Sequence, residues 1–384
     1  MAETAQPRRR RRSSKARRLQ PLLWALGGAL LGALTAKLLD HGQRTIPIDH
    51  TRTPAQQYRW TDLPAPGFPI PPQARYLSGL RVVLDPGHVG QRDPGGTWKR
   101  GPTGLREAEV NLRVAQFLRQ FLEAANAEVR LTRSTDESLD LPDKDDLQQR
   151  VELANSWPAD LFLSIHHNAS ADARANYTAV FYHGGPGRSP ASLDAARHLA
   201  AGLSAALRLE TQLPCPVVSD LALHANDGFA VLRLAEVPAV LCEASFHTNP
   251  QEEQRLRDPL YNRREAYGLF VGLVGWAYDG LPRVRLLQPA DGRVRRGGEV
   301  IVELDDGLSA RGGLGGDRRE IRADSLRVQL GERKVPYAVD WARRRLRVTI
   351  PRQQRSATTV LEVDFVNLLG QHVLHPRLVL EISD

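Results

Sequence analysis

Residues 82–115 read VVLDPGHVGQRDPGGTWKRGPTGLREAEVNLRVA, and this stretch decides the fold that we predict. The stretch begins within a short apolar run, Arg81 to Asp85. Pro86 and Gly87 follow this run, which is the pattern of a buried strand followed by a turn. Apolar residues then recur at helical spacing from Ala108 to Ala125, which predicts an amphipathic helix. A strand, a turn and a helix in this order are typical of α/β domains.

The same alternation of strands and helices continues to residue 278. We predict further strands over 128–132, 160–165, 178–182 and 238–243, and further helices over 146–155, 192–207 and 261–278. Several of these strands are apolar throughout, so the predicted fold class is α/β, a mostly parallel or mixed sheet with helices on both faces. In such sheets, functional residues lie beyond the carboxyl ends of the strands.

Two histidines and two glutamates stand near the ends of the predicted elements. His88 follows the first strand, His166 follows the strand DLFLSI, Glu243 ends the strand PAVLCE, and Glu107 begins the first long helix. Two histidines and one carboxylate are the protein ligands of a catalytic zinc ion, and a second carboxylate can carry a proton. The alternatives are ordinary ones: a loop histidine is usually structural, and a glutamate at a helix start interacts favourably with the helix dipole.

The quoted segment resembles the opening of zinc-dependent N-acetylmuramoyl-L-alanine amidases of bacterial cell walls. Those enzymes show a strand, DPGHGG, a Gly-rich loop, and Gly-x-x-Glu before a helix. Further matches occur in the family's order and cover about residues 80–280. They are LTRSTDE (131–137), QRVELAN (149–155), LFLSIHHNA (161–169), AVLR (230–233) and PAVLCEASFHTNP (238–250).

The resemblance implies a site and a reaction. His88, Glu107 and His166 match the family's zinc ligands, so Zn²⁺ is the implied cofactor, and Glu243 matches its catalytic glutamate. The implied reaction is hydrolysis of the amide between N-acetylmuramic acid and L-alanine in peptidoglycan. His167 stands where the family commonly has a small residue. We expect its side chain to point away from that of His166, and it either faces substrate or adds a metal contact.

Two other functions stay open from the sequence: a zinc hydrolase of another amide or peptide bond, and a catalytically silent peptidoglycan-binding regulator. Several residues also keep two interpretations. Arg150 either pairs with a carboxylate or substrate acid, or lies on a helix surface. His224 and Asp227 either line the substrate cleft or belong to a solvated loop. Cys215 and Cys242 either form a disulfide or leave Cys242 buried and free.

The basic character of the chain is concentrated in a tail. Of the formal net charge of +8, residues 1–20 carry +7, so a nucleic-acid partner is not indicated. Residues 21–36 (PLLWALGGALLGALTA) hold no charge. We predict a membrane anchor or an export signal over 21–39, and the structural alternative is a helix buried in the core of the protein. The tail would stay cytoplasmic and the rest would be extracytoplasmic (periplasmic), anchored or released by cleavage. A Pro-rich, extended linker is expected over 40–77.

We place the catalytic domain at 78–282 and a second domain at 283–384. The second domain shows about seven short strands with polar turns, which predicts an immunoglobulin-like β-sandwich. The expected strands are 284–289, 299–304, 325–331, 335–340, 346–350, 359–365 and 374–382. This domain is either a stabilising spacer or a surface for the cell wall or a protein activator.

Overall fold

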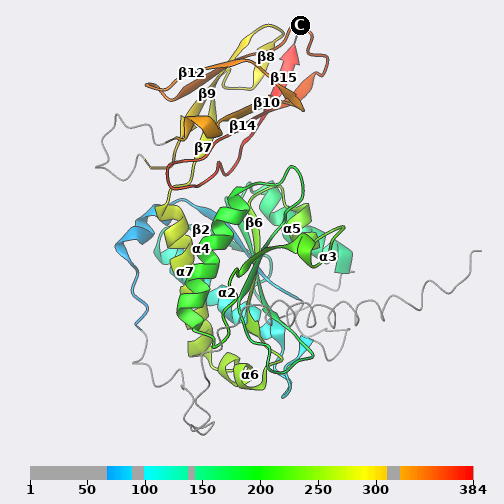
Figure 1. The fold of residues 1–384 in the computed structure, drawn as a ribbon, viewed down its shortest axis with the longest axis vertical. Helices are drawn as coiled ribbons and strands as arrows, with labels where there is room; N and C mark the ends of the chain where they lie inside the picture. The colour runs from blue at the N-terminus through cyan, green and yellow to red at the C-terminus, as the bar shows by residue number, and fades with distance from the viewer. Residues whose placement is uncertain (1–66, 89–98, 137–142, 309–320, 384) are drawn as a thin grey trace, which may run out of the picture. The chain divides into compact units, whose positions relative to one another are not determined.

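The computed structural model describes residues 67–88, 99–136, 143–308 and 321–383. Its centre is a six-stranded sheet in the order β2-β1-β3-β6-β4-β5 (Figure 1). The strands are β1 (Arg81–Pro86), β2 (Glu128–Leu131), β3 (Leu161–Asn168), β4 (Ala179–Tyr182), β5 (Val217–Ser219) and β6 (Ala239–Phe246). Strands β2, β1, β3 and β6 are mutually parallel, whereas β4 runs antiparallel to β6 and β5 runs parallel to β4. The prediction of a mixed sheet is therefore confirmed.

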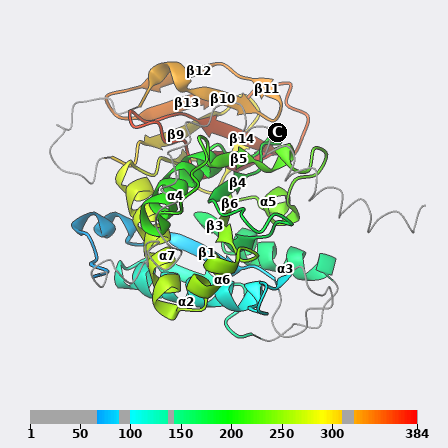
Figure 2. The same ribbon diagram turned by 60° about the horizontal axis from the view of Figure 1, so that its bottom comes forward.

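Helices cover both faces of this sheet. Helices α2 (Glu107–Ala124), α4 (Ala191–Leu207) and α7 (Pro259–Tyr278) pack together on one face, and α3 (Asp143–Ser156) and α5 (Ala230–Leu234) lie on the other (Figure 2). The short helix α6 (Pro250–Leu256) connects β6 to α7. The predicted helices are all present, whereas β5, α5 and α6 were not predicted because three to seven residues carry too little periodicity.

The three central strands bring their carboxyl ends to one edge of the sheet. Strands β1 and β3 are buried over most of their length, as their apolar sequences require. Adjacent residues on a strand point to opposite faces, so Ser164 and His166 share one face and Ile165 and His167 the other. Ser164 donates to Asp85 Oδ2 at 2.6 Å on the face that α3 covers.

Helices α4 and α7 approach each other closely because glycines line their contact. A methyl group on Gly202 would lie 2.2 Å from the carbonyl oxygen of Gly268, and one on Gly272 would lie 2.7 Å from the carbonyl oxygen of His198. Backbone atoms cannot move aside as a flexible side chain does. The small residues at these positions therefore set the distance between the two helices.

The carboxyl-terminal region forms two antiparallel-rich sheets around an apolar core. One sheet has the order β11-β10-β14-β15-β8 and the other β12-β13-β9-β7. Side chains from both sheets, Val302 and Val363 among them, are fully buried in one cluster. The strands are β7 (Arg283–Gln288), β8 (Arg293–Arg295), β9 (Glu299–Asp305), β10 (Arg327–Leu330), β11 (Arg333–Lys334), β12 (Tyr337–Asp340), β13 (Arg345–Thr349), β14 (Thr358–Asp364) and β15 (Arg377–Ser383).

In its described residues, 283–308 and 321–383, this all-β region contains two strands more than the seven we predicted. Strands β8 and β11 are three and two residues long, too short for an alternating pattern to mark them. The last strand begins at Arg377 rather than Leu374, directly after Pro376, which has no amide hydrogen to donate to a neighbouring strand. The immunoglobulin-like topology stays a prediction.

The α/β and all-β regions belong to one compact unit, and two buried carboxylates of the α/β region pair with partly exposed side chains of the all-β region. Asp160, at the start of β3, is 1% exposed and accepts a hydrogen bond from Arg283 Nη1 at 2.8 Å. Asp194, in α4, is equally buried and pairs with His372 Nδ1 at 2.9 Å.

The expected linker differs from the prediction at its carboxyl-terminal end. Residues Pro72–Leu77 form a 3₁₀ helix that packs against α7 and buries Ala74 and Leu77. Proline is compatible with the first turn of a helix, so the prolines did not exclude this short element. The basic tail, the apolar segment 21–39 and residues 40–66 lie outside the described residues. Within the described ranges, no helix is both long and apolar enough to span a membrane.

The glycine contact between α4 and α7 gives a first prediction. Gly202→Ala places a methyl group against backbone, so we expect the free energy of unfolding to fall by about 1–3 kcal/mol. Gly275→Ala on α7 is the control, because its methyl group would meet only the His198 side chain, at 3.2 Å, and alanine favours a helix by about 1 kcal/mol over glycine. Urea denaturation measures both variants. Equal midpoint shifts would contradict close backbone packing at Gly202.

Candidate metal centre

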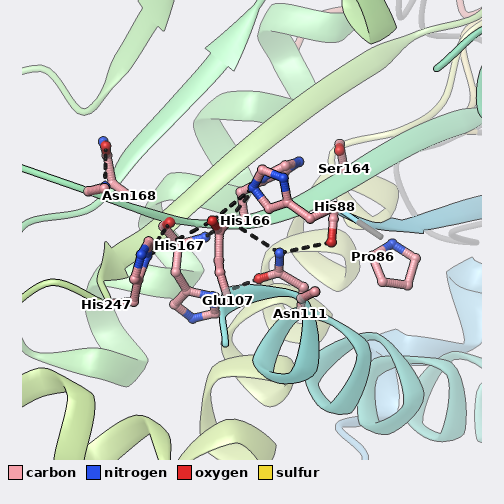
Figure 3. A network of polar contacts seen from close by, with 12 residues as sticks. Pro86, His88, Glu107, Asn111, Ser164, His166, His167, Asn168 and His247 are labelled. Atoms are coloured by element: carbon pink, nitrogen blue, oxygen red, sulfur yellow. Dashed lines mark hydrogen bonds and ion pairs between the residues drawn. The ribbon is translucent and has the colours of Figure 1, made fainter. Parts of the chain in front are cut away.

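Three predicted ligands meet at the carboxyl edge of the sheet. Glu107, the first residue of α2, lies between two imidazoles: its Oε2 is 2.8 Å from His88 Nε2, and its Oε1 is 3.1 Å from His166 Nδ1 (Figure 3). One ligand atom from each residue lies within 4.8 Å of those from the others. This donor set could hold a metal ion.

The turn that carries His88 has an unusual backbone. His88 has φ = 63°, in the left-handed region, which costs a non-glycine residue about 1–2 kcal/mol. Two arginines hold the carbonyl groups of this turn: Arg133 donates to Pro86 O and Gly87 O at 3.0 and 3.2 Å, and Arg150 donates to Pro86 O and His88 O at 3.0 and 2.9 Å. These hydrogen bonds offset the strain and fix the direction of the His88 side chain.

Arg150 is itself anchored by two carboxylates. It is 5% exposed and pairs with Asp85 at 2.8 Å and with Asp146 at 2.7 Å. Burial opposes ionisation of Asp85, but Arg150, with hydrogen bonds from Ser164 and Thr132, keeps the pKa of Asp85 below its ordinary value. Of the two interpretations of Arg150, pairing with a carboxylate is confirmed and a surface position is wrong.

Glycine at position 87 makes room for His166. A methyl group added to Gly87 would lie 2.1 Å from His166 Cε1 and Nε2. The imidazole therefore packs directly on the Gly87 backbone, and no larger residue fits beneath it. We call this contact between the Gly87 backbone and the His166 ring the glycine cradle. A side chain at position 87 would occupy the space that the ring fills.

Glu243 lies beside this group on the neighbouring strand. His166 on β3 and Glu243 on β6 are register partners, and partners in a parallel pair point to the same face of a sheet. Glu243 Oε2 is buried and has no hydrogen-bond partner among the residues that the structure describes. Burial, and next the negative charge of Glu107, raise the pKa of Glu243 well above its ordinary value.

The surroundings of Glu107 and His88 shift the pKa of both groups. Burial would raise the pKa of Glu107, but His88 and His166 outweigh it and hold this pKa well below its ordinary value. For His88 the balance is reversed, because burial lowers its pKa more than Glu107 raises it. A lowered pKa of Glu107 favours the carboxylate and a lowered pKa of His88 favours the neutral imidazole, and these are the forms that bind a metal ion.

His167 points away from His166, as expected, but it does not face substrate. It is 1% exposed, and its ring contacts Asn111 on α2 and Glu265 on α7. The expectation of a substrate contact or a further metal contact is wrong, because alternation along β3 turns this side chain under the helices.

Four residues around the site were not singled out from the sequence. Asn111 donates to Glu107, Arg133 holds the His88 turn, and Glu265 contacts His167. His247 is fully buried, with its Nδ1 2.9 Å from His167 O and 4.0 Å from Glu107 Oε2. A signal existed for Glu265, which is the one acidic residue of the predicted helix 261–278.

The remaining candidates lie elsewhere. His224 and Asp227 are exposed in the loop after β5, at the end of the sheet opposite to the metal centre, so the solvated-loop interpretation holds. Cys215 is exposed and free, and Cys242 is buried and free. The disulfide alternative is therefore wrong.

Comparison with known proteins is consistent with this geometry. The family model described as N-acetylmuramoyl-L-alanine amidase matches residues 82–274, half of the chain. The chain belongs to the N-acetylmuramoyl-L-alanine amidase family. It is 31% identical over 241 residues to the amidase AmiA of Escherichia coli K12, a match covering 53% of this chain and 79% of AmiA. It is 30% identical over 202 residues to LytC of Bacillus subtilis 168, covering 52% of this chain and 36% of LytC.

Among solved structures, this amidase is similar to AmiC2 of Nostoc punctiforme. The sequences are 27% identical, the TM-score is 0.43, and the match covers 52% of this chain and 98% of AmiC2. The residues that the family model matches, 82–274, lie within the α/β region of this amidase.

The cradle under His166 gives a second prediction. Gly87→Ala displaces the His166 imidazole, so we expect divalent-metal affinity and amidase rate to fall at least about tenfold, as when a ligand's supporting contacts are lost. Gly67→Ala is the matched control, because a methyl group there meets nothing within 4 Å. Metal titration of both purified variants checks this. Native affinity in Gly87→Ala would rule out the cradle.

Proposed function

We propose that this amidase hydrolyses the amide between N-acetylmuramic acid and L-alanine in peptidoglycan with a zinc ion held by His88, Glu107 and His166. The observation that carries the proposal is the convergence of these three donors beside Glu243, whose Oε2 atom is buried and has no hydrogen-bond partner among the described residues. Family membership indicates the class of reaction, and the set of two imidazoles and one carboxylate indicates which metal ion would bind.

The chemistry of the donors favours zinc over a hard cation. Magnesium and calcium prefer sets of oxygen ligands, whereas two imidazoles and one carboxylate are a catalytic zinc set. The glycine cradle and the held His88 turn fix the two imidazoles before any ion arrives. When bound, zinc would polarise the amide carbonyl and activate a water molecule for attack.

Glu243 would move the proton. Its Oε2 makes no hydrogen bond within the described part of the chain, so this atom can accept a proton from water without first breaking another contact. The raised pKa of Glu243 favours its holding that proton. Glu243 would then deliver the proton to the leaving amine of L-alanine.

We also propose where this reaction takes place. The basic tail followed by an uncharged segment at 21–36 supports an extracytoplasmic catalytic part, held at the membrane or released by cleavage. The same tail explains the excess positive charge without a nucleic-acid partner. The all-β region would serve as a spacer or as a surface for the wall or an activator.

Glu243 and the metal give a third prediction. Glu243→Gln removes the proton acceptor while preserving the shape of the side chain, so we expect at least a 100-fold loss of peptidoglycan hydrolysis with zinc still bound. Digestion of purified peptidoglycan followed by mass spectrometry checks this, and the native enzyme should release stem peptides that begin with L-alanine. Chelation should abolish the native activity, and added zinc should restore it.

The control is Glu236→Gln, an exposed glutamate three residues before β6, which should cleave normally. Near-native cleavage by Glu243→Gln would refute its role. Cleavage only within the stem peptide would instead indicate a zinc hydrolase of another bond, and a native chain with bound zinc but no cleavage would indicate a silent binding protein.

A further inference from the structure

A buried chain of polar side chains runs from α7 to the candidate metal centre. Glu265 on α7 lies 3.0 Å from His167 Nε2, and His167 Nδ1 lies 2.8 Å from Asn111 Oδ1. Asn111 Nδ2 in turn donates to Glu107 Oε1 at 3.3 Å, and the backbone amide of His167 donates to the same oxygen at 3.1 Å. Glu265 and Asn111 are fully buried and His167 is 1% exposed. Figure 3 shows Asn111, His167 and Glu107 at this junction.

The hydrogen-bond partners fix the direction of this chain. Asn111 Nδ2 faces two acceptors, Glu107 Oε1 and the carbonyl oxygen of Gly87, so its nitrogen must donate to both. Its amide oxygen therefore faces His167 and can only accept, which places a hydrogen on His167 Nδ1. Nε2 faces the Glu265 carboxylate, so one proton lies between these two groups.

We propose that Glu265, His167 and Asn111 form a buried tether that positions Glu107 for the metal ion. The tether directs two donors, the Asn111 amide and the His167 backbone amide, at Glu107 Oε1. That leaves Oε2 facing His88 Nε2, at 2.8 Å. This inference rests on the proposed metal centre and assigns positioning residues to it, since none of the three touches substrate.

A purely structural pair would not need this arrangement. A buried ion pair can often be replaced by apolar residues without loss of stability, whereas removing one partner leaves an uncompensated charge. Positioning of Glu107 is the function that the contacts of this pair support.

The test separates positioning from stability with a double variant. In His167→Leu/Glu265→Leu the buried polar pair is replaced by apolar side chains of similar volume, so we expect the urea midpoint to stay near native or rise. Zinc affinity of the purified full chain, measured by chelator competition, should fall about 10- to 100-fold, the usual cost of losing partners that orient a metal ligand. The visible absorption spectrum of the Co²⁺-loaded variant should differ from that of the native chain.

Two single variants complete the design. Glu265→Gln keeps a hydrogen-bonding partner for His167 Nε2 and should retain zinc affinity within a few-fold. Tyr261→Phe is the matched control. Tyr261 lies one turn before Glu265 on α7, and this variant removes its buried 2.8 Å hydrogen bond to Glu252 on α6 while leaving the hydrogen bonds of the tether in place. Its zinc affinity should stay native.

The outcomes are distinct. Native zinc affinity and an unchanged Co²⁺ spectrum in the folded double variant would overturn the tether and leave the metal centre standing. Failure of the native chain to bind zinc would overturn the metal centre and the tether together.

Discussion

The buried carboxylate of Glu107 is the group on which the rest of the site depends. An ionised carboxylate that is 2% exposed requires compensation, and here it comes from several separate elements. His88 arrives from the turn after β1, His166 and the His167 amide from β3, and Asn111 from the next turn of α2 itself. The sheet edge, the helix start and the turn must therefore be in register before the charge is satisfied.

Polar residues on both faces of the sheet hold the groups that surround Glu107. On the α3 side of the sheet, Arg150 joins two buried carboxylates to the carbonyl groups of the His88 turn. On the α7 side, the tether reaches Glu107 through Asn111. The centre is thus held from both faces of the sheet, and these contacts offset the strain of the left-handed His88. Such supporting contacts usually govern how well a metal ligand is oriented.

Much of this organisation could be predicted from the sequence. The apolar runs at β1, β3 and β6 and the helical spacing of α2 and α7 indicated a covered sheet, because burial on both faces leaves near-continuous apolar strands. The positions after those strands then indicated which residues would meet. Short elements such as β5, β8 and α6 could not be predicted, because runs of a few residues are too short to show a hydrophobic period.

The sequence by itself determined the layered α/β architecture and the group of His88, Glu107, His166 and Glu243, since these follow from local patterns and from the rule that parallel strands end at one edge. Only the tertiary structure decided what lies behind them. The burial of His167 against Glu265, the anchoring of Arg150 and the free state of Cys242 depend on side chains that are far apart in the chain. No local period in the sequence encodes such contacts, because they arise when helices pack on the sheet. Glycines such as Gly202 set the distance between two of these helices, α4 and α7.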